Sequence, residues 1–406
     1  MTKVIFIVCD GLGDRPVRQL GGKTPLEAAS TPNLDQLAKE GICGLVHTVD
    51  IGIRPGSDTS HLALFGYDPK IYYTGRGPFE TAGIDMEMKP GDICFRANMG
   101  TVDEKMIVID RRAGRIDDTS EFADLFNGMV IDGATFLLKK GTGHRVGLII
   151  RGKGLSSRII DADPHEIGEK IHQVKSTDGS KEAEFTAEVL NKFLKTTHEK
   201  LKDLPSNKER EKAGELPANF ILVRGAGVFP RVPSFKEKYG LKAVCLAGAG
   251  LYKGIGKILG MVTPNIEGAT GKPDSNLKVK IAELKKLYDK FDFFFIHFKG
   301  ADTLGEDGNC QAKKEFIEKI DQAIEPLLDL KDTLIVVTAD HSTPCELKAH
   351  SADPVPVLIW GRQVRTDKVV SFGERDCIQG GLGQVKGLNI MPIVIDLLGQ
   401  AQLYGA

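Results

Sequence analysis

The chain has 406 residues, of which 41% are hydrophobic and 27% are charged, as is usual for a globular protein. Its 54 Lys and Arg residues nearly balance its 55 Asp and Glu residues, so the overall charge does not indicate nucleic acid or an anionic membrane as a partner. A chain of this length is expected to form two or three domains.

The first residues and the cysteines indicate where the protein works. Residues 4–9 form an apolar run after one lysine that is too short for a signal peptide, and no stretch approaches the ~18 apolar residues that span a membrane. The seven cysteines are scattered without a C-x-x-C pair, which argues against a disulfide framework and against a thiolate zinc site. We therefore expect a reduced, cytoplasmic enzyme that binds neither nucleic acid nor membrane. The sequence leaves a homo-oligomer open.

The N-terminal part alternates strand and helix. Residues 3–9 (KVIFIVC) predict a fully buried strand. Residues 31–41 (TPNLDQLAKEG) predict a helix with a threonine N-cap, proline at the first position and glycine past the end. Within residues 54–69 (RPGSDTSHLALFGYDP), Ser57 follows a Pro-Gly turn and suits the N-cap of a helix over residues 58–65.

The middle of the chain has a different pattern. From about residue 73 to residue 231 the predicted strands are shorter and mixed with turns, and residues 165–217 are rich in Lys and Glu, which favours helix. We interpret residues 75–235 as an inserted, smaller α+β domain. Residues 1–74 and 236–406 then form one discontinuous α/β domain.

The C-terminal part returns to alternation. Strand-like runs occupy residues 242–247, 291–298, 333–339 and 355–360. Helical patterns occupy residues 277–291, 310–329 and 389–399. Such alternation predicts an α/β fold in which helices cover both faces of a mostly parallel sheet.

Polar side chains follow the ends of the predicted strands. They are Asp10, Asp302, Glu306, Asp340, His341 and His350. In an open α/β sheet ligands bind at this edge, so these side chains are expected to converge. Taken singly, Asp10 could form a turn, Asp340 could cap one, His350 could be structural, and Asp302 with Glu306 could form a solvated helix face. Together they are better explained as ligands of two divalent ions ~3.5–4 Å apart. Mixed carboxylate and imidazole ligands favour Mn²⁺, Zn²⁺, Co²⁺ or Mg²⁺.

Ser57 offers a hydroxyl group to such a centre. At a helix N-terminus it faces backbone N–H groups and the positive end of the helix dipole, which suit a phosphorylated serine. A divalent ion nearby would make its hydroxyl a nucleophile at neutral pH. His61, four residues later, is either a proton shuttle or a structural residue.

A glycine-rich segment, AVCLAGAGLYKGIG, follows a predicted strand and has part of the pattern of a dinucleotide-binding fingerprint. Lys253 stands at the third glycine position, and no acidic residue ends a second strand at the usual distance. We therefore assign no nicotinamide site. Gly248 and Gly250 are expected to permit a tight turn from strand to helix.

Several motifs together resemble the archaeal type of cofactor-independent phosphoglycerate mutase, a family of the alkaline phosphatase superfamily. They are FIVCDGLGD, TPLEAASTPNLDQLAKEG, RPGSDTSHLALFGYDP, YYTGRGPFETAG, CFRANMGTV, DRRAGRI, GADTLGEDGN and TADHSTPCELKAHSADPVPVLIW, in order along nearly the whole chain. The resemblance implies an alkaline-phosphatase-like sheet sandwiched by helices. It also implies an isomerase of glycolysis and gluconeogenesis that interconverts 3-phosphoglycerate and 2-phosphoglycerate without bisphosphoglycerate.

The resemblance implies roles for the residues at the strand ends. Ser57, transiently phosphorylated, would hold one ion with Asp10, Asp340 and His341, and Asp302, Glu306 and His350 would hold the other. Position 306 departs from the usual histidine of the family, and glutamate favours a harder ion. We expect two ions, most simply Mn²⁺, with Mg²⁺, Co²⁺ or Zn²⁺ as alternatives, and we expect Glu306 to favour Mn²⁺ or Mg²⁺ over Zn²⁺.

A phosphoglycerate mutase must also hold the phosphate and the carboxylate of its substrate, and arginine forks suit both. The inserted domain offers Arg76, Arg96, Arg112, Arg115 and Arg145. The resemblance favours Arg96, Arg112 and Arg115 as substrate contacts, with Asp110 near the transferring proton and Lys253 near the phosphoryl group.

Water must be excluded while the serine is phosphorylated. We expect the inserted domain to act as a lid, with hinges near residues 70–80 and 230–240. A phosphomonoesterase, in which water reaches the phosphoserine, and an inactive metal-binding module are the alternatives.

Overall fold

The computed structural model describes residues 2–330 and 332–405. The chain divides into two compact units: unit 1 comprises Met1–Tyr73 and Val232–Ala406, and unit 2 comprises Thr74–Arg231. Unit 1 is therefore discontinuous in sequence, and unit 2 is an insertion within it. None of the described helices has the length and apolarity needed to cross a membrane.

Unit 1 is built on a seven-stranded sheet in the order β13-β2-β12-β11-β1-β10-β9. The strands are β1 (Lys3–Cys9), β2 (Ile42–His47), β9 (Ala243–Leu246), β10 (Phe293–Phe298), β11 (Thr333–Thr338), β12 (Val355–Trp360) and β13 (Gly383–Lys386). Strand β1 runs parallel to both β10 and β11, and β10 runs parallel to β9. The expected α/β class with a parallel-rich sheet is confirmed.

One strand of this sheet departs from the expected direction. Strand β12 is antiparallel to β11 and to β2. A parallel return needs a long crossover, usually through a helix, whereas residues 339–354 contain turns and bridges but no helix. Because β12 is reversed, its first residues lie at the edge of the sheet where β11 ends.

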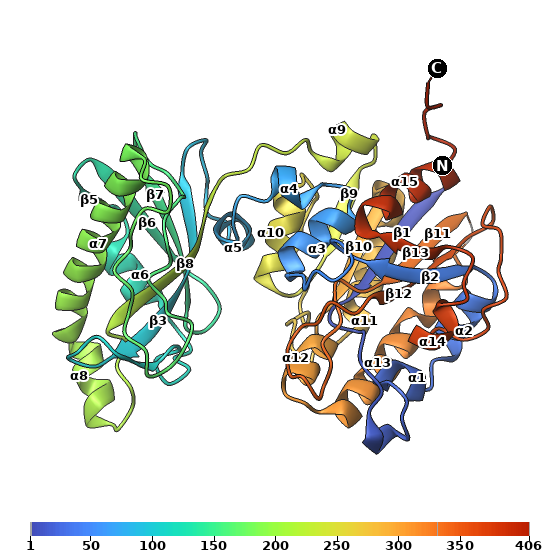
Figure 1. Ribbon diagram of the computed structural model, residues 1–406, viewed down its shortest axis with the longest axis horizontal. Coiled ribbons are helices and arrows are strands. Elements are labelled where there is room, and N and C mark those ends of the chain that lie inside the picture. Colours follow the sequence, from blue (N-terminus) through green and yellow to red (C-terminus); the bar gives the residue numbers. More distant parts are fainter. Residues whose placement is uncertain (1, 331, 406) are drawn as a thin grey trace. The chain divides into compact units, whose positions relative to one another are not determined.

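Helices cover both faces of this sheet (Figure 1). One group of helices packs around α13 (Cys310–Ile324). Its other members are α1 (Pro25–Ala28), α2 (Pro32–Lys39), α11 (Lys278–Leu287) and α12 (Gly300–Glu306). The other group comprises α3 (Ser57–Leu64), α4 (Pro69–Tyr72), α10 (Gly250–Ile258) and α15 (Gly387–Leu397). Short helices α9 (Phe235–Tyr239) and α14 (Glu374–Cys377) complete the unit. The spacing of Phe316, Ile317, Ile320 and Ile324 gives α13 one buried apolar face.

Unit 2 is an antiparallel sheet covered by a long helix. Its strands are β3 (Ile93–Val102), β4 (Val108–Asp110), β5 (Met129–Ile131), β6 (Ala134–Lys140), β7 (Arg145–Arg151) and β8 (Phe220–Val228), in the order β4-β3-β7-β6-β5 with β8 paired to β3. Its helices are α5 (Gly77–Gly83), α6 (Ser120–Phe126), α7 (Lys181–Lys202) and α8 (Pro205–Lys212). Helix α7 lies along this sheet (Figure 1), and Phe193 of α7 stacks on Phe136 of β6 with ring centroids 4.2 Å apart.

The Lys- and Glu-rich stretch expected over residues 165–217 is only partly helical. Helices α7 and α8 cover most of residues 181–212, whereas residues 165–180 form turns and loops. A glycine at position 168 and another at position 179, both with positive φ, explain why no helix forms there.

Candidate metal centre

The strand ends of unit 1 bring together most of the predicted metal ligands. Asp10 follows β1, Asp340 and His341 follow β11, and Asp302 lies in α12 directly after β10. His350 precedes the reversed strand β12 and so reaches the same edge. The side chains form two groups, Asp10 with Asp340 and His341, and Asp302 with His341 and His350.

The first group leaves buried carboxylate oxygens without hydrogen-bond partners. Nε2 of His341 lies 3.4 Å from Oδ1 of Asp10 and 3.2 Å from Oδ2 of Asp340. All three side chains are buried. Among the described residues, neither Asp10 Oδ1 nor Asp340 Oδ2 receives a hydrogen bond. A buried, unpartnered carboxylate oxygen is costly, so this arrangement suits a cation between the three side chains.

The second group has an imidazole fixed for ligation. Nδ1 of His350 lies 3.0 Å from the carbonyl oxygen of Pro55, which holds the proton on Nδ1 and leaves Nε2 free to coordinate. That Nε2 lies 3.5 Å from Oδ1 of Asp302. The rings of His341 and His350 stack with centroids 3.5 Å apart. The two groups are therefore in direct contact through His341.

The charges of these groups are consistent with a cation site. Burial would raise the pKa of Asp10, but Lys299, His297 and His341 hold it well below the usual value. Burial would lower the pKa of His341, but the carboxylates of Asp340 and Asp10 raise it to about 10. Carboxylates and imidazoles without thiolates are the ligands of Mn²⁺, Mg²⁺ and Zn²⁺ sites. The residues thus fit divalent ions.

The residue after Asp10 must be glycine, because neither its backbone conformation nor the space around it accommodates a side chain. Gly11 has φ +65°, and a Cβ atom there would lie 2.6 Å from Cα of Asp302. Its N–H donates to Oδ1 of Asp340 at 3.1 Å. The dipeptide does form a turn, and the same turn brings Asp302 and Asp340 close to Asp10.

Ser57 lies at the start of α3 and faces the first group. Its Oγ atom is 3.2 Å from Nε2 of His341, and its side chain is buried. The expectation that Ser57 is the N-cap was wrong: Gly56 takes that position with extended backbone, and Ser57 is the first helical residue. Glycine is tolerated as an N-cap and leaves the hydroxyl of the next residue available.

His61 has a backbone contact. Its Nδ1 donates to the carbonyl oxygen of Ser57 at 2.6 Å, and its ring packs against Phe65, Tyr252 and Phe295. The same Nδ1 lies 3.7 Å from Oδ2 of Asp340, so the structural role and the proton shuttle both stay open.

Two predicted residues of unit 1 lie outside both groups. Glu306 ends α12, one turn after Asp302, and is exposed. Desolvation of its carboxylate and then the charge of Asp302 raise its pKa. Nζ of Lys253 lies 3.5 Å from Oδ1 of Asn265. Three residues that the sequence did not single out, Tyr252, His297 and Lys299, contact Asp10 instead.

Unit 2 contains a separate cluster of arginines around one buried carboxylate. Glu80 lies 3.0 Å from Nε of Arg76 and 3.4 Å from Nη1 of Arg96. The charges of Arg76, Arg96 and Arg145 outweigh burial and lower the pKa of Glu80 to about 2. Arg224 is the cross-strand neighbour of Arg96. A cluster with more guanidinium groups than carboxylates suits an additional anion.

Arg96 is the arginine of this cluster whose surroundings best suit binding of an anion. Its side chain is 13% exposed, and its Nε atom has no hydrogen-bond partner among the described residues. Burial lowers the pKa of Arg96, although the carboxylate of Glu80 acts in the opposite direction.

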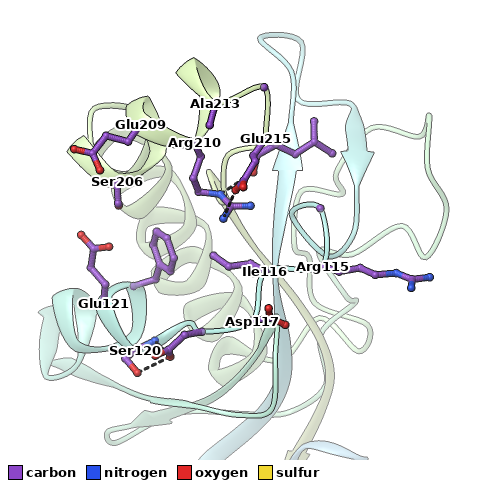
Figure 2. Close-up of a pocket in the computed structure, with 15 residues that line it drawn as sticks. Arg115, Ile116, Asp117, Ser120, Glu121, Ser206, Glu209, Arg210, Ala213 and Glu215 are labelled. Carbon is purple, nitrogen blue, oxygen red and sulfur yellow. Dashed lines mark hydrogen bonds and ion pairs between the residues drawn. The ribbon is translucent and has the colours of Figure 1, made fainter.

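The other predicted substrate residues lie elsewhere in unit 2. Asp110 accepts from the N–H groups of Arg112 and Gly114 at 2.7 and 3.0 Å, and so closes the turn after β4. Arg112 and Arg115 are exposed. Arg115 borders a hollow of about 1040 Å³ formed by the turn after β4, α6 and α8, but its side chain extends away from Arg210 and Glu215 (Figure 2).

A parallel-rich sheet whose edge carries two carboxylate–imidazole groups beside a buried serine defines a metal-dependent enzyme of the α/β class. The family model of the Metalloenzyme superfamily matches residues 2–397. The chain is 50% identical over 409 residues to the 2,3-bisphosphoglycerate-independent phosphoglycerate mutase of Methanococcus aeolicus, with 100% of each chain covered. It is 49% identical to the corresponding mutase 1 of Methanocaldococcus jannaschii, covering 99% of this chain and 98% of that one.

Solved structures agree with these relatives. The cofactor-independent phosphoglycerate mutase of Thermoplasma acidophilum has a TM-score of 0.70 and 38% identity, covering 98% of this chain and 99% of that one. A Pyrococcus horikoshii protein has a TM-score of 0.87 and 36% identity, covering 100% and 99%. The chain therefore belongs to the Metalloenzyme superfamily and, within it, to the family of 2,3-bisphosphoglycerate-independent phosphoglycerate mutases. The resemblance noted in the sequence is confirmed.

Proposed function

We propose that this protein interconverts 3-phosphoglycerate and 2-phosphoglycerate through a phosphoserine on Ser57, without bisphosphoglycerate. The main support is the position of Ser57: its hydroxyl lies 3.2 Å from His341, within the ligand groups and at a helix N-terminus. The full-length relatives carry the name of this activity. The reaction would serve glycolysis and gluconeogenesis, and we expect it in the cytoplasm.

The proposed ion ligands are those inferred from the family. Asp10, Ser57, Asp340 and His341 would hold one divalent ion, and Asp302, Glu306 and His350 would hold the other, with Mn²⁺ as the preferred ion. When bound, the ions would neutralise phosphate charge and make the serine hydroxyl nucleophilic at neutral pH. The unpartnered oxygens of Asp10 and Asp340 support this assignment.

The chain's own residues would carry out two successive transfers. Oγ of Ser57 loses its proton and forms a bond to the phosphorus of 3-phosphoglycerate, the bond from phosphorus to the substrate O3 breaks, O3 takes up a proton, and glycerate remains bound. The 2-hydroxyl of glycerate then loses its proton and attacks the phosphoserine, and Oγ of Ser57 leaves and is protonated again. Catalysis of this kind depends on positioning and on charge stabilisation.

The glycerate must be held while it turns. We propose that arginines of unit 2 bind its anionic group, with Arg96 the best supported because it lies in a cluster with excess positive charge. Arg112, Arg115, Asp110 and Lys253 remain proposed contacts from the family resemblance. Unit 2 is proposed to act as the lid that excludes water from the phosphoserine.

The test is ³¹P NMR of the Mn²⁺-loaded protein with 3-phosphoglycerate and no bisphosphoglycerate. We expect the resonance of 2-phosphoglycerate to appear. Release of inorganic phosphate alone would instead identify a phosphomonoesterase, and would overturn the proposal.

A further inference from the structure

The glycine-rich segment GAGLYKGIG, which lacks a dinucleotide fingerprint, brings a tyrosine to the metal centre. It leaves β9 and forms α10 (Gly250–Ile258) beside the ligand groups. Tyr252 of α10 donates a hydrogen bond from Oη to Oδ2 of Asp10. Tyr252 and Asp10 are 242 positions apart in sequence. They meet because α10 packs closely on the sheet whose strand β1 ends at Asp10.

Gly256 allows α10 to approach the sheet closely, and Gly248 lets the turn before α10 pass close to a loop. A Cβ atom on Gly248 would lie 2.5 Å from the carbonyl oxygen of Ala269, which lies in that loop and outside the sheet. A Cβ atom on Gly256 would lie 2.8 Å from Cβ of Cys245 in β9. Larger residues at these positions would displace the helix and the tyrosine with it.

The ring of Tyr252 is held rigidly. Tyr252 is 1% exposed, and its ring stacks on His297 of β10 with centroids 3.4 Å apart and an interplanar angle of 22°. The ring of His61 lies 5.1 Å away on a tilted plane. A phenol packed in this way offers its hydroxyl in one direction, toward Asp10.

The two oxygens of Asp10 have different surroundings. Oδ2 accepts from Tyr252 and lies 3.2 Å from Nε2 of His297 and 3.4 Å from Nζ of Lys299. Oδ1 has no hydrogen-bond partner among the described residues and lies 3.4 Å from Nε2 of His341. One oxygen is thus occupied by the protein, and the other points into the ligand group.

We propose that Tyr252 is a positioning residue that fixes the carboxylate of Asp10, so that its free oxygen is available to a divalent ion. The proposal rests on the metal-binding role of Asp10 proposed above. Groups that hold a metal ligand in place commonly account for ~10–100-fold in metal affinity. Tyr252 has this role because a neutral donor orients Asp10 without adding charge to the site.

The test measures Mn²⁺ binding directly, from the electron paramagnetic resonance signal of free Mn²⁺ during titration of the full-length protein. We expect Tyr252→Phe, which keeps the ring and its stacking on His297, to weaken Mn²⁺ binding by ~10-fold or more. Circular dichroism of the metal-free protein checks that the variant is folded. An unchanged dissociation constant in the folded variant would overturn the proposal.

Tyr67→Phe is the matched control. Tyr67 is also a fully buried tyrosine of unit 1, its hydroxyl has no hydrogen-bond partner among the described residues, and it belongs to neither ligand group. We expect this variant to bind Mn²⁺ as the wild type does. An equal loss in both variants would mean that any buried hydroxyl matters, and would contradict the specific role of Tyr252.

A double-mutant cycle tests whether Tyr252 acts through Asp10. In an Asp10→Ala background, Tyr252→Phe should weaken Mn²⁺ binding no further. A full additional loss would show that Tyr252 acts by another route. These readouts do not need mutase activity, so a failure of the proposed reaction and a failure of this inference can be told apart.

Discussion

Oγ of Ser57 lies 3.2 Å from Nε2 of His341, although 284 positions separate the two residues in sequence. The same nitrogen lies 3.4 Å from Asp10 and 3.2 Å from Asp340. The serine hydroxyl is therefore in direct contact with the first candidate ligand group. A cation bound by that group would lie close to the hydroxyl, as the proposed role of Ser57 requires.

Replacing Ser57 with alanine should abolish mutase activity, because no other described hydroxyl of α3 faces the ligand groups so directly. Mass spectrometry after denaturation should detect a phosphorylated peptide in the wild type incubated with substrate, and none in Ser57→Ala. Ser60→Ala is the matched control, since Ser60 lies in the same helix but contacts Thr48 at 3.2 Å. Phosphoglycerate interconversion by a folded Ser57→Ala protein would contradict the phosphoserine mechanism.

Replacing Glu306 with histidine should shift the metal preference toward Zn²⁺. Glutamate offers a hard oxygen ligand at the end of α12, whereas an imidazole suits Zn²⁺ better. Competition between Mn²⁺ and Zn²⁺ during titration would show the change in relative affinity. If the order of preference is the same in both proteins, Glu306 does not determine metal selectivity. Glu315→His, on the exposed side of α13, is a suitable control.

Replacing Arg96 with lysine should raise KM for phosphoglycerate by ~10-fold or more, with a smaller change in kcat. A lysine keeps the charge but loses the fork that can contact Glu80 and an anion together. Arg158→Lys is the control, because Arg158 is an exposed arginine of unit 2 paired with Asp178 at 3.5 Å. Steady-state kinetics of both variants show whether the effect is specific to Arg96. An unchanged KM for Arg96→Lys would mean that Arg96 does not bind the anionic group of the substrate.

The candidate ligand groups could be predicted because Asp10, Asp302, Asp340 and His341 each follow a strand that an apolar run identifies, and His350 directly precedes another such run. The parallel sheet then brings Asp10, Asp302 and Asp340 together without further information. The residues around them could not be predicted in this way. Tyr252 reaches Asp10 because Gly256 allows α10 to pack closely on β9, and no spacing rule in the sequence encodes that approach.

The arginine cluster of unit 2 could be predicted only in part, for a related reason. Arg96 was recognised from its motif, but Glu80 and Arg224, which lie near it, come from a different helix and strand. Cross-strand neighbours in an antiparallel sheet depend on the register, and more than a hundred residues separate β3 from β8 in sequence, so no hairpin turn fixes the register between them. The reversal of β12 escaped prediction because a single apolar run has no direction.

Removing the charge of Lys313 should destabilise the protein strongly. Its fully buried Nζ contacts the carbonyl oxygens of Gly13 and Thr343 at 3.0 and 2.9 Å and Oδ2 of Asp14 at 2.8 Å. It thereby joins the loops that follow β1 and β11. Breaking a buried, hydrogen-bonded ion pair costs about 3–5 kcal/mol, so Lys313→Met should lower the free energy of unfolding by that amount in urea denaturation.

Lys192→Met is the comparison for Lys313. Lys192 makes ion pairs with Asp132 and Glu188, but its side chain is 48% exposed. Exposed pairs contribute little to stability because solvent screens them, so this variant should unfold at nearly the same urea concentration as the wild type. Similar losses in the two variants would mean that burial of the Lys313 pair has no special importance.

Glu374 should make the stability of the protein depend on pH between about 4.5 and 7. Its oxygens accept hydrogen bonds from Thr24 and from the N–H of Asp14, yet burial outweighs them and raises its pKa from 4.5 to about 7. The folded state then binds the proton more tightly than the unfolded chain. The stabilising contribution is complete below pH 4.5 and is lost as pH rises through 7, by on the order of 3 kcal/mol at most. The test is to measure the free energy of unfolding of the wild type and of Glu374→Gln at several pH values across that range. The variant should lack the decrease that Glu374 causes in the wild type as pH rises. A pH profile parallel to that of the wild type would show that Glu374 ionises at its ordinary pKa.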